Sequence, residues 1–191
     1  MKSLLRNALL CAGCILVSAP ALAAPAPEWT PREGGRLGFV ASWEGIEFEG
    51  VFHKFDAAIC FDPADLAGSR FEVKVDVTST DTQSSDRDEG LADPEWFDYA
   101  KYPQATFASS SIKAVGDGKY EAAGTLTIKG VSHDIAFPFA WEEHDRVAHL
   151  TGQTVLKRTD YHIGEGEWAE DDTVGLDVRV NVDLLLDSKT P

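Results

Sequence analysis

The stretch YEAAGTLTIKGVSHDIAFPFAW, residues 120–141, consists of two runs in which apolar and polar side chains alternate, and Gly130 separates them. Alternation with a period of two is typical of β-strands, and a Gly-containing turn between two such runs is typical of a β-hairpin. Pro138 lies opposite the apolar face of the second run and has no backbone N–H to donate. We therefore predict a hairpin whose second strand has a bulge, a break or a sheet edge at Pro138.

Two further segments show the same alternation. In residues 71–78 Phe and Val alternate with polar side chains, so one face of the strand is apolar and the other is polar and faces solvent. Residues 174–184 continue such a pattern well beyond the roughly five or six residues of a usual strand. Long strands of this kind favour a barrel, and strands dominate the chain.

One segment does not have the pattern of a strand. Asp93 can cap a short helix in which Pro94 occupies the first turn, which predicts a helix over residues 94–100. Trp96 and Phe97 are too apolar for a free surface loop, so we expect this helix to cover one end of the barrel. The predicted fold is thus all-β with a short helix.

Residues 1–23 have the features of an export signal. Lys2 and Arg6 precede an apolar run at residues 8–17, and small residues before position 24 form a cleavage site. We therefore expect a cleaved signal peptide and a periplasmic protein. No other stretch approaches the roughly 18 apolar residues of a spanning helix.

The remaining chain divides simply. Residues 24–35 are rich in Pro and Gly and predict an irregular lead-in, and residues 36–191 are of a length for one domain. Cys60 is the one cysteine outside the signal, so we expect no intramolecular disulfide and interpret Cys60 as a buried thiol.

The charge balance excludes one class of partner. The chain has 17 Lys and Arg against 32 Asp and Glu, a net charge of −15. A surface this acidic repels the phosphate backbone, so we expect no nucleic-acid partner. The same charge gives no help in docking to anionic lipid head groups.

Four stretches together carry a resemblance to a known family. Residues 50–66, 87–109, 120–139 and 158–168 succeed one another in an order that resembles the YceI-like family of exported lipid-binding proteins. The resemblance spans roughly residues 36–185. The sequence departs from the family where Asp160-Tyr161-His162-Ile163 stands in place of the commoner Asp-Phe-Gly-Ile. It also has Arg-Glu-Gly-Gly-Arg at residues 32–36, where Asp-x-x-x-Ser is frequent.

The resemblance implies an extended, lipocalin-like, eight-stranded antiparallel β-barrel that holds a long apolar chain, such as a polyisoprenoid or an isoprenoid quinone. The alternation alone fits a ligand cavity and a packed core equally well, and the resemblance favours the cavity. We predict that apolar side chains on the inward face line this cavity: Phe48, Phe52, Phe71, Val75, Leu126, Phe137, Phe139, Trp141, Val178 and Val180.

Two smaller sets of residues are further candidates. Arg158 and Asp160 are two apart and would share a strand face, so we interpret them first as a structural ion pair and second as a clamp for a ligand head group. Trp96 and Phe97 of the predicted helix, or Pro138 at the strand break, are candidates for a gate.

No constellation of residues predicts catalysis or a metal site. Ser132-His133-Asp134 contains the residue types of a hydrolytic triad, but neighbours on a strand point apart. The five histidines are scattered along the chain, which argues against a shared metal. We therefore predict a non-enzymatic carrier with no cofactor and one amphiphilic lipid as its partner, as a monomer or weak homodimer. The alternatives are an accessory that presents a bound quinone to a membrane cytochrome and, third, a lipid-acting enzyme.

Overall fold

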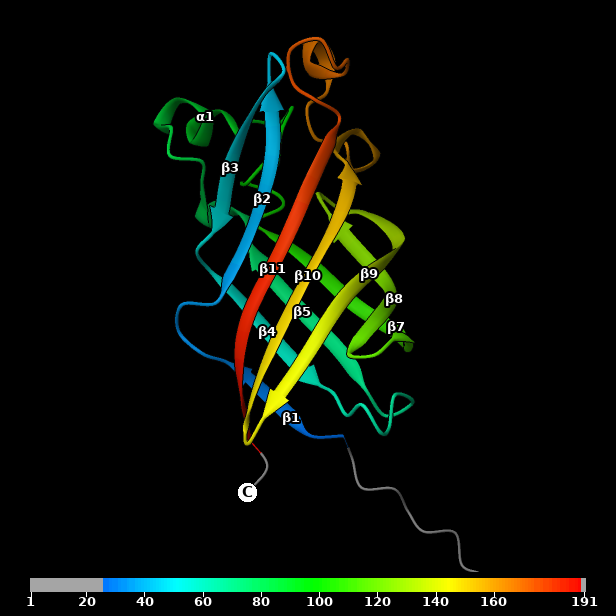
Figure 1. Cartoon of the computed structure of the whole chain (residues 1–191). Coiled ribbons are helices and arrows are strands. Elements are labelled where there is room, and N and C mark those ends of the chain that lie inside the picture. Colours follow the sequence, from blue (N-terminus) through cyan, green and yellow to red (C-terminus); the bar gives the residue numbers. More distant parts are fainter. Residues whose placement is uncertain (1–25, 190–191) are drawn as a thin grey trace, which may run out of the picture.

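Eleven antiparallel strands form one sheet that closes into a barrel (Figure 1). The computed structural model describes residues 26–189. The short strand β1 closes the barrel at one end, since it pairs with both β4 and β11. The strands are β1 (Glu28–Pro31), β2 (Arg36–Trp43), β3 (Ile46–Phe52), β4 (Phe55–Cys60), β5 (Arg70–Asp76), β6 (Thr80–Asp81), β7 (Gln104–Gly116), β8 (Lys119–Ile128), β9 (Val131–His144), β10 (Val147–Lys157) and β11 (Asp177–Ser188).

The eleven strands make an eight-stranded barrel, as predicted. β3 and β4 together occupy one strand position of the barrel. They are interrupted at residues 53–54, and β3 pairs with β2 while β4 pairs with β5. β1 and β6 are short strands that stand first and last in the strand order of the sheet. The longest antiparallel ladders join β10 to β11, β7 to β8 and β8 to β9, and two of them contain the long alternating segments of the sequence.

The hairpin predicted at residues 120–141 is formed by β8 and β9. Lys129 and Gly130 occupy its two-residue turn with φ of 50° and 77°, the positive values that a type I′ turn requires. β9 pairs with β10 only from Phe139 to His144. Residues 131–138 have β8 as their only ladder partner in the described chain, so the ladder between β9 and β10 ends beside Pro138. Of the three predicted alternatives the structure shows the sheet edge, since β9 itself runs unbroken through Pro138.

An aromatic cluster fills the barrel at the end where β1 lies, and we call it the aromatic plug. Phe61 is fully buried at its centre, and its ring centroid lies 4.7 Å from that of Trp141 and 5.0 Å from that of Tyr120. Trp29 of β1 donates its indole N–H to the carbonyl oxygen of Phe61 at 3.0 Å. The expected irregular lead-in thus contains a strand whose tryptophan belongs to the core. The plug consists of Trp29, Phe61, Phe71, Tyr120, Phe139 and Trp141.

The opposite end carries the helical segments. The helix predicted at residues 94–100 is wrong: the α-helix is α1 (Ser85–Gly90), and residues 94–100 form a series of turns. The Asp88 carboxylate accepts hydrogen bonds from the backbone N–H and the hydroxyl of Thr82, at 2.9 and 2.7 Å, and these bonds fix the start of α1. Three 3₁₀ helices complete the structure: Val77–Ser79, Arg158–Tyr161 and Gly166–Trp168. Within residues 26–189 no helix is both long enough and apolar enough to cross a membrane.

An exposed ion pair beside β1 gives the fold a predictable response to acid. Both nitrogens of the Arg32 fork donate to the Asp187 carboxylate, at 2.6 and 2.8 Å. The hydrogen bonds from Arg32, aided by its charge, hold the pKa of Asp187 below its usual value. Because the unfolded chain binds this proton more readily, the pair stabilises the fold above the unfolded pKa, and the contribution disappears as the pH falls through the lower folded value.

We expect the Tm of the wild type to fall more steeply than that of Asp187→Asn between about pH 5 and pH 2. Thermal unfolding followed by circular dichroism at a series of pH values measures both slopes. Equal slopes would show that Asp187 is not among the groups responsible for acid denaturation.

Candidate ligand cavity

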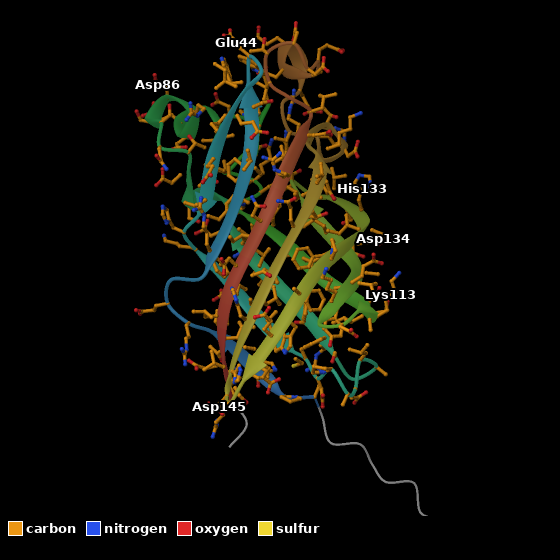
Figure 2. The ribbon with its side chains drawn as sticks, in the orientation of Figure 1. Glu44, Asp86, Lys113, His133, Asp134 and Asp145 are labelled. Atoms are coloured by element: carbon orange, nitrogen blue, oxygen red, sulfur yellow. The ribbon has the colours of Figure 1, made fainter. Side chains whose placement is uncertain are left out.

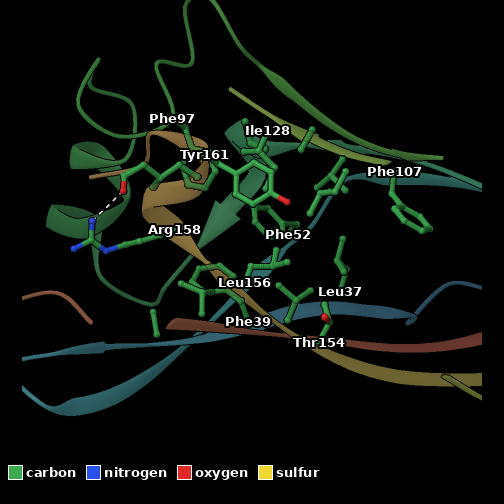
Figure 3. A pocket seen from close by; sticks show the side chains of 18 of the residues that line it. Leu37, Phe39, Phe52, Phe97, Phe107, Ile128, Thr154, Leu156, Arg158 and Tyr161 are labelled. Carbon is green, nitrogen blue, oxygen red and sulfur yellow. Dashed lines mark hydrogen bonds between the residues drawn. The ribbon is translucent and has the colours of Figure 1, made fainter. Parts of the chain in front are cut away.

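The interior of the barrel holds a cavity of about 560 Å³. This volume lies within the range of roughly 300–1,000 Å³ of small-molecule sites in proteins. Its wall consists of inward-facing side chains from the strands together with residues of the end loops (Figure 3). Nearly all of them are apolar, and the polar or charged members of the lining are Asp86, Arg87, Thr154, Arg158 and Tyr161.

The cavity is closed at one end and reaches the surface at the other. Phe71 belongs both to the cavity wall and to the aromatic plug, so the plug forms the floor. At the opposite end Trp43 is 38% exposed and Asp86 of α1 is exposed, although both line the cavity. The mouth therefore lies between α1, the β2–β3 turn and the loops of residues 158–176.

The structure brings most of the predicted lining residues together around the cavity. Phe139 and Trp141 are the exceptions: both are 4% exposed and belong to the aromatic plug, outside the cavity wall. They share the inward face of β9 with Phe137, but they lie nearer its C-terminal end, where rings fill the barrel. The predicted residues that do line the cavity are Phe48, Phe52, Phe71, Val75, Leu126, Phe137, Val178 and Val180.

The three gate candidates lie in different places. Trp96 and Phe97 line the cavity, and Trp96 packs against Trp168 with the ring centroids 5.9 Å apart. Trp168 in turn packs against Trp43, at 5.7 Å, so a row of tryptophans borders the mouth. Pro138 is exposed on the outer face of β9 and is absent from the cavity wall. A gate at Pro138 therefore does not fit this geometry.

Arg158 does not form the predicted ion pair with Asp160. β10 ends at Lys157, and the 3₁₀ helix that follows turns the two side chains apart. The Arg158 guanidinium is 4% exposed and donates to the carbonyl oxygens of six residues in the mouth loops: Ile163, Gly164, Trp168, Glu170, Val174 and Gly175. These bonds occupy all of its N–H groups, so it has no donor left for a ligand head group. Burial lowers the pKa of Arg158, and no carboxylate offsets this.

Arg87 is a second arginine at the cavity, and it was not among the candidate site residues. Its guanidinium carbon lies 4.4 Å from the centroid of the Phe48 ring, within cation–π distance. Its Nε and Nη2 donate to the hydroxyl and the carbonyl oxygen of Thr82, at 3.2 and 2.8 Å. Arg87 thus fixes α1 over the mouth and puts a positive charge there.

Ser132, His133 and Asp134 do not form a triad. Each side chain has a different partner: the Ser132 hydroxyl is 2.8 Å from that of Thr127, His133 Nε2 is 2.9 Å from the carbonyl oxygen of Asp160, and Asp134 accepts from Thr125 at 2.8 Å. Asp134 is exposed on the outer face of β9, whereas His133 is exposed at the rim of the barrel, on the strand face that also carries Ile135 and Phe137 (Figure 2). Among residues 26–189 no three His, Cys, Asp or Glu side chains gather as metal ligands.

Comparison with known proteins agrees with the barrel fold. The family model for the YceI-like domain matches residues 32–186. A UPF0312 protein from Ectopseudomonas mendocina is 31% identical over 182 residues, which cover 91% of this chain and 95% of the relative. The crystal structure of BcnA from Burkholderia cenocepacia superposes with a TM-score of 0.77 at 32% identity, over 79% of this chain and 95% of that one. A polyisoprenoid-binding domain from Saccharophagus degradans has the same fold, with a TM-score of 0.68 at 18% identity over 86% and 99% of the two chains.

Proposed function

The chain belongs to the YceI-like family, and on this premise we propose that it binds one long amphiphilic lipid, such as a polyisoprenoid or isoprenoid quinone, inside the barrel without catalysis. The observation that carries the proposal is the apolar cavity of about 560 Å³, closed below by the aromatic plug. Each methylene that leaves water for such a cavity contributes about 0.8 kcal/mol, so a long chain binds without polar contacts.

The same geometry favours a carrier over an enzyme. The residue types of a triad point to opposite faces of β9 and have separate partners, and the side chains around the cavity are almost all unreactive. A carrier needs only a cavity with a mouth through which the lipid exchanges. With a cleaved signal at residues 1–23, this exchange would take place in the periplasm.

A second role is compatible with this cavity, in which the bound lipid is a quinone and the protein presents it to a membrane cytochrome. The exposed residues of the loops near the mouth favour a basic partner surface, because they include the carboxylates of Glu44, Glu165, Glu167, Glu170, Asp171 and Asp172. Reduction and reoxidation of the bound lipid by such a partner would distinguish this role from simple carriage.

Native mass spectrometry of the mature protein tests the proposal directly. We expect protein purified without detergent from the periplasm of its own host to carry one lipid, which solvent extraction releases for identification. A mass that corresponds to the polypeptide alone, together with failure of the extracted lipids to bind when added back, would contradict the proposal.

A further inference from the structure

Two hydroxyl groups face the apolar cavity without a hydrogen-bond partner. Tyr161 is 3% exposed, and its hydroxyl points into the cavity between Arg158 on one side and Phe107 on the other (Figure 3). Thr154 lines the cavity from β10. Within residues 26–189 neither hydroxyl forms a hydrogen bond to another protein group. Both residues line the cavity, so a ligand there can reach them. Thr154 is half-buried but Tyr161 is buried, and a buried hydroxyl without a protein partner costs free energy, so the position of the Tyr161 hydroxyl needs an explanation.

The ring of Tyr161 is held firmly in this position. On its outer side the imidazole of His133 packs edge-on, with ring centroids 5.1 Å apart at an angle of 83°. His133 Nε2 also lies 2.9 Å from the carbonyl oxygen of Asp160, the residue before Tyr161. On the other side Arg158 binds the carbonyl oxygens of Ile163 and Gly164, both at 2.9 Å. The hydroxyl is thus presented to the cavity at a fixed point, as a preorganised binding group.

The charged side chains of the cavity wall offer no free hydrogen-bond donor at this point. The N–H groups of Arg158 are bound to backbone carbonyl oxygens. The other two charged residues of the lining, Asp86 and Arg87, lie on α1 at the mouth. Burial raises the pKa of Tyr161, with a smaller contribution from the charge of Asp160, so the phenol stays protonated and able to donate. An anionic head group at this depth would lose its hydration without gaining a free N–H donor, because those of Arg158 are bound to backbone carbonyls, whereas an uncharged oxygen needs only one hydrogen bond.

We infer that the Tyr161 hydroxyl forms a hydrogen-bonding site for an uncharged oxygen of the ligand, such as a carbonyl or hydroxyl, and that Thr154 offers a second, separate hydroxyl on the cavity wall. The polar group of the lipid therefore lies inside the barrel and not at the mouth. This inference rests on the proposed function, since it assigns the chemistry of the ligand within the same cavity. It makes Tyr161 the residue that discriminates an oxygenated lipid from a hydrocarbon.

Three probes of equal chain length test the inference: a long-chain methyl ketone, the fatty acid and the alkane. Their affinities are measured by competition against a fluorescent apolar probe, for the mature wild type and for Tyr161→Phe, Thr154→Val and Tyr102→Phe. Tyr102→Phe is the matched control, because Tyr102 is 37% exposed and lies outside the cavity wall. Since the Tyr161 hydroxyl has no protein partner, Tyr161→Phe should keep the Tm of the wild type.

We expect the wild type to bind the ketone about three- to tenfold more tightly than the alkane. Tyr161→Phe should remove most of this preference, Thr154→Val a smaller part and Tyr102→Phe none, while alkane binding stays unchanged. The fatty acid should bind more weakly than the ketone.

Other outcomes separate this inference from the proposed function. If Tyr161→Phe retains the full preference, or if the fatty acid binds most tightly and loses affinity in Arg87→Gln, the head group lies at the mouth and the inference is wrong while the carrier function stands. If the wild type binds none of the three probes, the proposed function fails and the inference fails with it.

Discussion

Replacement of Val180 by Trp should weaken lipid binding by roughly two orders of magnitude while the protein stays folded. Val180 lies on the inward face of β11, between Thr154 of β10 and Phe39 of β2, and all three line the cavity. An indole at this position occupies the space of roughly four methylenes of an extended chain, and at about 0.8 kcal/mol each the loss is on the order of 3 kcal/mol. Titration with the lipid extracted from the wild type measures this loss.

The substitution is informative because the cavity provides space for the larger side chain. Adding a ring to a filled core strains it, whereas filling an existing cavity leaves stability unchanged or raises it. Val155→Trp is the matched control: Val155 is 56% exposed on the outer face of the neighbouring strand β10, so the same substitution there should leave binding intact. Wild-type affinity in Val180→Trp would place the lipid outside the barrel, and a large fall in Tm would indicate a packed interior.

The alternation of side chains predicts which residues face inward, but not how deep along the barrel each one lies. Phe137 and Phe139 are two residues apart on the same face of β9, and their rings are stacked with centroids 6.1 Å apart. Phe137 lines the cavity while Phe139 belongs to the aromatic plug. The difference arises because rings from other parts of the chain, Phe61 and Phe71 among them, converge on Phe139. Contacts between distant segments decide this, and a local pattern does not contain them.

The same limit explains the errors in the loops. The expectation that Arg158 and Asp160 share a strand face assumed that β10 continues, but the strand ends at Lys157. The groups that bind Arg158 are backbone carbonyls, which every residue type has, so no sequence pattern predicts which of them bind it. Tyr161 was likewise not among the predicted site residues. The sequence feature that indicated this site was the departure from Asp-Phe-Gly-Ile at residues 160–163. There Tyr161 stands in place of Phe and so carries a hydroxyl on its ring.

Removal of the Arg158 guanidinium should have the largest effect on stability. In Arg158→Met the six carbonyl oxygens that it binds lose their donor, and the bonds to three of them, Ile163, Gly164 and Val174, are buried. Leaving buried polar groups unpaired costs at least about 3 kcal/mol for a charged network of this kind. For a chain of this length the Tm should fall by roughly 10 °C. Thermal unfolding of the lipid-free protein measures it.

The loss should be concentrated at the mouth, because Arg158 ties the loops of residues 158–176 to one another. Two backbone bonds join these loops to the end of β2: Gly175 N–H donates to Ser42 at 3.1 Å, and Glu44 N–H donates to Thr173 at 2.7 Å. In Arg158→Met both amides should exchange with solvent far faster than in the wild type. Arg179→Met is the matched control, since Arg179 forms an exposed pair with Glu47 and should change the Tm little. Wild-type Tm and slow exchange at Gly175 in Arg158→Met would show that apolar contacts alone hold the mouth loops.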